Sequence, residues 1–264
     1  MTEISTSQLH QEELEVELWE APSPRPDAES MSELQQVYSD SSDQAVGNKA
    51  VGDGSALPDL GPLSDFKTWE SVACTILHKL ETASGFNPGS TVFDPVAWSE
   101  YLRKFSTIPF FLTYTSDIRH ASISSLSLEK GIDAVSDLVE NIMTPTGFQD
   151  VVTTIKKIAR LAFESEGKTE KTSNLQLGIL SRHERGLYLA VVRTAVEMKY
   201  KDGKGYEPVQ QAIDIYRGYG VLDLDKCKRQ AGTLLKWPLW DVNQWENETA
   251  SAPVPPSESP AWSQ

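Results

Sequence analysis

The sequence predicts an α+β protein in which helical layers pack on a small antiparallel sheet, flanked by disordered acidic tails. Late in the chain, three β-prone apolar runs follow one another at 175–179, 187–200 and 209–221. Turn-forming residues at 183–186 and 201–205 separate these runs. Because no helix intervenes, we expect a three-strand antiparallel meander, with strands and helices segregated along the chain.

The middle run predicts a strand that is central in the sheet along its first half. Its side chains alternate between two faces, and both faces are apolar at first. One face carries Tyr188, Ala190, Val192, Thr194, Val196 and Met198. The other face carries Leu187, Leu189, Val191, Arg193, Ala195, Glu197 and Lys199. Because the second half is amphipathic, we expect it to project towards water.

Apolar residues at helical spacing predict two helices ahead of the sheet. The first spans 65–83. The second begins at Asp94 and Pro95, which are an N-cap and a first-turn proline, and ends near residue 106. The apolar run 108–114 then predicts a strand, and Pro109 restricts that strand to an edge or to a strand start.

A helical hairpin is predicted between this strand and the meander. Apolar residues recur on one face of 127–142 and again on one face of 148–163. The short segment Thr144-Pro145-Thr146-Gly147 interrupts the pattern and would form the connection. We expect the hairpin to supply much of the core.

The net charge of −14 belongs to the two ends of the chain. Residues 1–64 hold thirteen Asp or Glu against two Lys or Arg, and residues 241–264 hold four acids and no base. Few large apolar residues accompany these charges, which predicts disordered tails over 1–64 and 247–264 around one α+β domain over 65–246. So acidic a chain disfavours nucleic acid as a partner, although an acidic tail can fold back on a basic face and mask it.

The sequence contains no motif for catalysis, nucleotide binding or metal binding. None of the four histidines, His10, His78, His120 and His183, is paired with another at i,i+4 or lies beside a Cys-x-x-Cys. We therefore expect a non-enzymatic protein with no cofactor and no bound metal.

The sequence also indicates a cytoplasmic location. Two cysteines, Cys74 and Cys227, are too few for a disulfide framework. The N-terminal residues lack the charged start and apolar run of a signal peptide. No apolar run approaches the roughly 18 residues that would span a bilayer. Secretion by a non-classical route stays open.

A short motif at 9–19 interrupts the acidic N-terminal tail. Acidic and apolar residues alternate there. Its candidate partner-binding residues are Leu14, Val16, Leu18 and Trp19. The functional interpretation is a linear motif that binds a groove or a sheet edge on a protein partner. The alternative is a chance apolar cluster in a solvated tail.

Cys227 is the candidate site for a ligand or an acyl group. Asp223 or Asp225 would cap the helix that carries it, and the helix dipole with Lys226 and Lys228 favours a thiolate. The apolar face on which Cys227 lies works in the opposite direction. The alternative, which we favour, is a small buried hydrophobe.

Basic and aromatic residues gather in the C-terminal part of the predicted domain. The candidate membrane or anion face consists of Lys226, Lys228, Arg229, Lys236, Trp237 and Trp240. Bases beside amphipathic aromatic rings suit an anionic membrane surface. The alternative is a solvated charged face whose tryptophans anchor the chain onto the core.

These observations predict a protein that engages an apolar ligand or a membrane surface. A toxin- or virulence-type protein would fit this architecture by analogy alone. The alternative is an interaction adaptor that binds a protein partner through the motif at 9–19.

Overall fold

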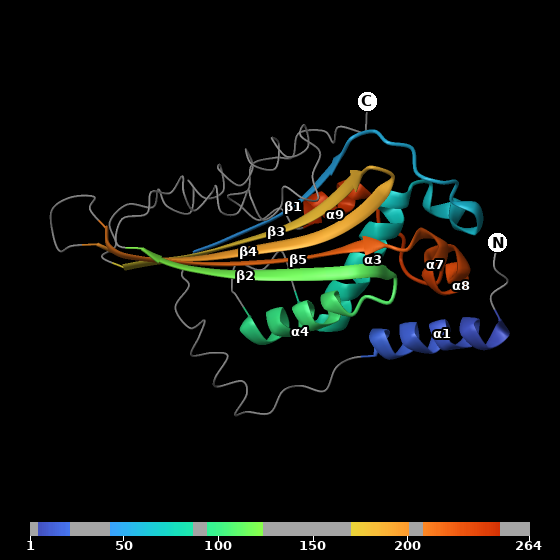
Figure 1. The fold of residues 1–264 in the computed structure, drawn as a ribbon, viewed down its shortest axis with the longest axis horizontal. Helices are drawn as coiled ribbons and strands as arrows, with labels where there is room; N and C mark the ends of the chain where they lie inside the picture. The colour runs from blue at the N-terminus through green and yellow to red at the C-terminus, as the bar shows by residue number, and fades with distance from the viewer. Residues whose placement is uncertain (1–4, 22–42, 87–93, 124–169, 201–207, 249–264) are drawn as a thin grey trace.

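The computed structural model describes residues 5–21, 43–86, 94–123, 170–200 and 208–248 (Figure 1). Its strands form one sheet in the order β1-β3-β4-β5-β2. The strands are β1 (Asp43–Gly52), β2 (Phe111–Ile123), β3 (Glu170–His183), β4 (Gly186–Tyr200) and β5 (Pro208–Leu222).

The meander and the α+β class are confirmed. β3, β4 and β5 pair antiparallel in sequence order. β2 adds antiparallel to β5, and β1 adds parallel to β3, so the sheet has one more strand on each side than the meander alone. β2 begins two residues after Pro109 and forms an edge, as expected for a proline at that position.

β4 lies at the centre of the sheet and is buried on both faces along its first half, as predicted. One face of the sheet enters the hydrophobic core through Leu180, Leu187, Leu189, Val191 and Leu222. Ala190 and Val192 alternate with these residues and are also buried. The side chains of 194–200 lie outside the described part of the structure.

The two helices predicted ahead of the sheet are α3 (Trp69–Ser84) and α4 (Pro95–Ser106). Asp94 caps α4 by accepting hydrogen bonds from two backbone amides of the first turn. Gly85 ends α3 in the left-handed conformation, with φ of 70°. The start of α4 is thus set by a side-chain cap, as the sequence indicated.

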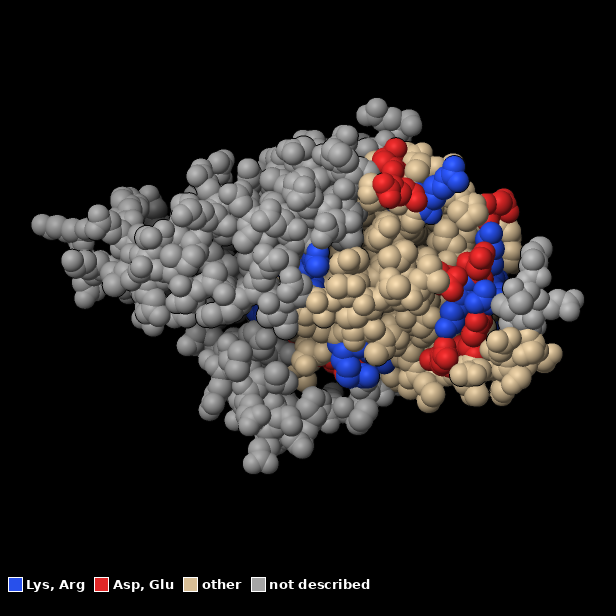
Figure 2. All heavy atoms as spheres, in the orientation of Figure 1, with Lys and Arg blue, Asp and Glu red and all other residues tan. Residues whose placement is uncertain are grey.

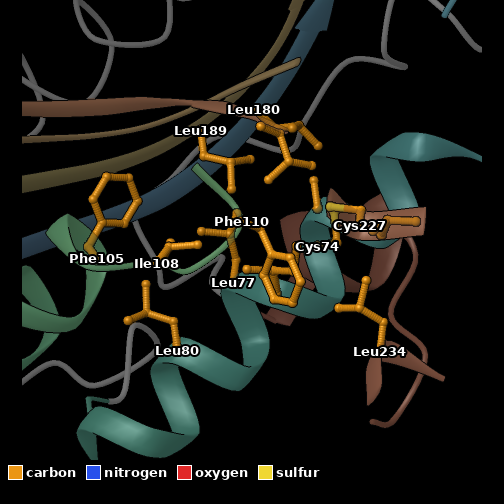
Figure 3. Packing of buried hydrophobic residues seen from close by; sticks show 14 of the residues in the cluster. Cys74, Leu77, Leu80, Phe105, Ile108, Phe110, Leu180, Leu189, Cys227 and Leu234 are labelled. Atoms are coloured by element: carbon orange, nitrogen blue, oxygen red, sulfur yellow. The ribbon is translucent and has the colours of Figure 1, made fainter. Parts of the chain in front are cut away.

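Helix α3 is the centre of the core. Every residue from Trp69 to Leu77 is buried. The helix contacts β4, α4, the 3-10 helix η1 (Gly61–Phe66) and the C-terminal helix α9 (Val242–Glu248). Figure 3 shows side chains of α3, the strands and the C-terminal helices meeting in this cluster. None of the described helices has the length and apolar character needed to cross a bilayer.

The expectation of a disordered tail over 1–64 is wrong for two stretches. Residues 6–20 form helix α1 (Thr6–Glu20), and residues 43–66 contain β1 and η1. The error has a physical reason, because order here comes from tertiary contacts. Val16 and Trp19 are buried against the rest of the fold, and β1 pairs with the open edge of β3.

Several sequence expectations lie outside the described residues. These are the helical hairpin over 127–142 and 148–163, the turn at 201–205, and the tails over 22–42 and 249–264.

α9 covers the outer edge of β1 around Ala50. The Ala50 amide donates to Glu246 Oε1 over 2.8 Å, and Asn48 Nδ2 donates to the Trp245 carbonyl over 3.4 Å. Gly178 of β3 makes this approach possible, because a Cβ there would meet Asn48 and lie 3.2 Å from the Trp245 ring. A capped edge of this kind cannot pair freely with another strand.

The β3–β4 turn is strained. Glu184 and Arg185 have φ of 46° and 65°, a left-handed backbone conformation that residues with a Cβ rarely adopt. Asp53 Oδ2 accepts from the Glu184 amide over 3.1 Å, and Ser55 Oγ accepts from the Arg185 amide over 3.2 Å. Burial alone would raise the pKa of Asp53, but hydrogen bonds from Ser55 and Glu184 lower it to about 2. The segment after β1 therefore holds the turn in place.

Replacing both turn residues by the pair that prefers this conformation should stabilise the protein. Glu184→Asn with Arg185→Gly fits a type I′ hairpin and should raise the free energy of unfolding by about 1 kcal/mol. Urea unfolding followed by circular dichroism measures the change. Glu184→Ala with Arg185→Ala is the control, since it removes the same side chains but keeps both Cβ atoms. Equal stabilisation by the two pairs would contradict backbone strain as the cause.

Candidate functional site

The predicted basic surface is built on two short helices, α7 (Leu224–Arg229) and α8 (Ala231–Leu234), and the segment after them. Asp223 caps α7 by accepting a hydrogen bond from the Lys226 amide over 2.8 Å, as predicted. We refer to the predicted residues as the basic face: Lys226, Lys228, Arg229, Lys236, Trp237 and Trp240. Helix α1 lies along this end of the molecule (Figure 1).

Two glutamates of α1 bind two bases of α7. Glu15 Oε2 accepts from Lys226 Nζ over 2.8 Å. The carboxylate of Glu12 accepts from Arg229 Nη2 over 2.7 Å and from Arg229 Nε over 3.2 Å. Gln230 Nε2 adds a third hydrogen bond to Glu12, over 3.3 Å. In Figure 2, acidic and basic side chains interleave over the end of the molecule where Figure 1 places α1, α7 and α8.

The pairing changes the protonation of Glu12. The hydrogen bond from Arg229 holds the pKa of Glu12 below its ordinary value of 4.5, with smaller contributions from Gln230 and Lys226. Burial acts in the opposite direction but is outweighed. The same hydrogen bond raises the pKa of Arg229. The charged form of Glu12 is therefore the form that favours the docked helix.

The C-terminal end of α1 is held by a buried lysine. Trp19 Nε1 donates to the Lys104 carbonyl over 2.9 Å. In return, Lys104 Nζ donates to the carbonyls of Trp19 and Ala21, which are at the end of α1. Lys104 is 1% exposed, and burial lowers its pKa. A cation at the carbonyl end of a helix also interacts favourably with the helix dipole.

Glu20 connects the same end of α1 to Trp237. Its Oε1 accepts from Trp237 Nε1 over 3.0 Å, and its Oε2 lies 3.1 Å from Lys79 Nζ on α3. The rings of Trp19 and Trp237 are 6.2 Å apart. α1 is thus held at one end by charged pairs with α7 and at the other by an aromatic and charged anchor.

The two tryptophans of the basic face anchor the chain, as the alternative interpretation of the sequence states. Trp237 is 6% exposed. Trp240 stacks on His78 of α3 with ring centroids 4.0 Å apart. Its amide donates to Thr75 Oγ1 over 2.9 Å, and its carbonyl accepts from Ser71 Oγ over 2.6 Å.

The basic face is therefore not one open surface. Lys226 and Arg229 are paired with α1, whereas Lys228 lies over the Trp69 ring with its Nζ 5.8 Å from the centroid. Lys236 is exposed.

The structure divides the motif at 9–19 into an inner and an outer side. Val16 and Trp19 are buried against the body of the protein. Leu14 and Leu18 face outward, with 44% and 76% of their surface exposed. Two of the four predicted partner-binding residues are thus buried within this chain, next to the basic face.

Cys227 lies within the core. Its side chain is fully buried on α7 and belongs to the cluster around α3 (Figure 3). Burial raises the pKa of the thiol, Asp223 raises it further, and the opposing effects of Lys226 and Arg229 are smaller. The other cysteine, Cys74, is also buried, and its thiol pKa is raised by burial. This environment disfavours the thiolate that nucleophilic chemistry would need.

Sequence reasoning missed the acidic partners and the buried lysine. Glu12 and Glu15 share the inner stripe of α1 with Val16 and Trp19, at spacings of three, four and seven. That spacing indicates that the four residues lie on one side of a helix, and it could have identified the two glutamates. Lys104 carried no signal, because nothing in its local sequence distinguishes it from a solvated lysine. Among the described residues, no group of three or more His, Cys, Asp or Glu could hold a metal ion.

Comparisons with known proteins find no matching family model and no matching curated protein. Among solved structures, one described as the Evf virulence factor is similar with a TM-score of 0.39 and 10% identity, over 87% of this chain and 93% of the other. A delta-endotoxin is similar with a TM-score of 0.38 and 9% identity, over 69% of this chain and 83% of the other. At these TM-scores, neither function nor a shared fold follows from the likeness.

Burial predicts that Cys227 and Cys74 do not react in the folded protein. A thiol reagent such as DTNB at pH 8 should label neither residue until guanidinium unfolds the chain. Lys236→Cys, which puts a thiol at an exposed position, should react at once and is the positive control. Cys227→Ser should lower the free energy of unfolding by about 1–3 kcal/mol, because a hydroxyl is buried in an apolar site. Rapid labelling of native Cys227 would contradict this placement.

Acid should release the N-terminal part of α1. Docking lowers the pKa of Glu12, so charged Glu12 stabilises the docked helix fully above about pH 4.5. This stabilisation is lost as the pH falls through the lowered pKa that Glu12 has in the docked state. Hydrogen exchange of the amides in 6–20, corrected for intrinsic rates, should show constant protection from pH 7 to 5 and less protection below pH 4. Glu12→Gln should flatten this profile, because it removes the carboxylate whose pKa docking lowers. An identical profile in Glu12→Gln would argue against the Glu12–Arg229 pair.

Proposed function

We propose that this chain is a non-enzymatic protein that binds an anionic membrane surface through the basic face. One observation carries the proposal. Lys226 and Arg229 already hold carboxylates at 2.8 and 2.7 Å, so this face is arranged to bind anionic groups. Phosphate and carboxylate groups of anionic lipids present the same chemistry.

The surroundings of these bases favour a membrane over a dissolved anion. Lys236 is exposed, and Leu235 and Leu239 beside it have 38% and 48% of their surface exposed. Exposed leucines next to bases form the mixture of apolar and cationic groups that lies in a lipid–water interface. A site for a small dissolved anion would not need these leucines.

The second candidate function is an interaction adaptor, and one observation favours it. Leu14 and Leu18 are one helical turn apart on the outer side of α1 and are both exposed. A partner that contacts this ridge would leave α1 docked on the basic face. The adaptor function would then depend on these two leucines and not on the bases of α7.

Co-sedimentation with vesicles tests the proposed function. The protein should bind vesicles of phosphatidylserine and phosphatidylcholine at low salt, and it should not bind vesicles of phosphatidylcholine alone. The triple variant Lys226→Ala, Arg229→Ala, Lys236→Ala should lose about 1 kcal/mol of binding free energy for each base removed. Binding should also weaken as salt increases.

A charge-matched control removes three exposed bases that do not belong to the basic face. Lys67→Ala, Arg103→Ala, Arg185→Ala changes the net charge equally but leaves the basic face intact. An equal loss of binding in both triple variants would show general charge attraction and no defined face. The variant Glu12→Ala with Glu15→Ala removes the carboxylates that pair with Arg229 and Lys226. If neither this variant nor the wild type binds anionic vesicles at low salt, the membrane function is rejected.

A further inference from the structure

Helix α1 and an anionic membrane require the same cations. Lys226 and Arg229 are the bases that the proposed function assigns to the membrane, and they are also the bases bound by Glu15 and Glu12. We propose that α1 is an intramolecular mask that occupies these cations in the free protein and is displaced from them by an anionic surface. This inference rests on the proposed function and adds a means of regulating it.

The distribution of contacts along α1 fits a helix that lifts at one end. Val16 and Trp19 are the buried residues of the helix, and both lie in its C-terminal part. The described contacts of the N-terminal part with α7 and Gln230 are made by the side chains of Glu12 and Glu15. The side chain of Glu15 is 47% exposed, so its ion pair is open to salt and competing ions. The more buried pair of Glu12 and Arg229 is screened less, and the buried contacts of Trp19 do not depend on charge. The N-terminal part can therefore separate while Trp19 stays anchored at Lys104.

The exchange of one anion for another makes displacement feasible. Glu12 and Glu15 would return to water when α1 lifts, and lipid head groups would take their place beside the two bases. No charge is left buried without a partner, so the large penalty for breaking a buried pair does not apply. The net free energy is then the difference between two similar pairings, which a high local density of anionic lipid can reverse.

The two sides of α1 provide a matched experiment. Glu12→Ala with Glu15→Ala removes the two carboxylates that bind the basic face. Glu13→Ala with Glu17→Ala removes two carboxylates from the exposed side of the same helix, and no described contact of these residues reaches α7. Both pairs change the net charge by the same amount, so general attraction to an anionic vesicle rises equally in the two proteins.

Two measurements are made on each full-length protein. The first is acetylation of Lys226 by an amine-reactive ester, quantified by mass spectrometry relative to Lys236. Lys226 has 14% of its side chain exposed in the docked state, whereas Lys236 is already exposed and serves as the internal reference. The second is affinity for phosphatidylserine vesicles. Thermal melts establish that each variant is folded, and the single variants Glu12→Ala and Glu15→Ala replace the double variant if its melt is lowered.

We expect Glu12→Ala with Glu15→Ala to increase acetylation of Lys226 several-fold and to bind anionic vesicles roughly tenfold more tightly than the wild type. Glu13→Ala with Glu17→Ala should match the wild type in both measurements. Adding anionic vesicles to the wild type should lower the hydrogen-exchange protection of residues 6–15 more than that of 16–20.

Three results would overturn the mask. Equal gains in vesicle affinity for the two pairs would show that net charge alone is responsible. Wild-type affinity as high as that of Glu12→Ala with Glu15→Ala would show that α1 does not compete, while the membrane function itself would stand. Increased acetylation of Lys226 without vesicle binding by any protein would show that the bases are released but do not bind a membrane, in which case the proposed function fails and the mask has no role.

Discussion

The burial of helix α3 is the constraint on which the described structure depends. Every residue from Trp69 to Leu77 is buried, so this helix needs neighbours on all sides and not only on one apolar stripe. The sheet, α4, η1 and α9 cover much of it. Its Ser71 and Thr75 hydroxyls bond to the backbone of Trp240, which brings the C-terminal segment over its polar side. The segment from Trp240 through α9 is thus part of the core's cover.

Local chemistry explains which elements the sequence could predict. Asp94 and Pro95 set the start of α4, and the turn at 183–186 lies between two runs with strand periodicity, so both features are written in a few neighbouring residues. β1 has no such signal, because its Gly- and Ala-containing sequence becomes a strand only when it pairs with β3. The sequence predicts a motif without a helix at α1, because acidic residues lie among its apolar residues and hide the periodicity that normally reveals a helix.

The candidate site was predictable in its parts but not in its assembly. The bases of α7, the motif at 9–19 and the capping Asp223 could each be read from the sequence, and so could the possibility that an acidic segment folds onto a basic face. The sequence does not show that the motif at 9–19 is the acidic segment that folds onto the bases of α7, because Glu12 and Arg229 are far apart in sequence. Trp237 and Trp240 present a related difficulty. The sequence of an aromatic residue beside bases is the same whether its ring faces lipid or packs on a helix. Lys104 is the extreme case, since the carbonyls that bind its ammonium, those of Trp19 and Ala21, lie 85 and 83 residues away in the sequence.

The parallel pairing of β1 with β3 has a consequence for synthesis on the ribosome. Among the described strands β1 is made first, whereas its partner β3, in which Ser173 pairs with Asp43, is made much later. Glu246 of α9, which caps the Ala50 amide of β1, is made later still. Most contacts of this strand are therefore of long sequence separation, and such contacts form slowly because a large loop must close first. During translation β1 has to wait unpaired until β3 has been made, and its Gly-containing, weakly apolar sequence suits a strand that waits without aggregating.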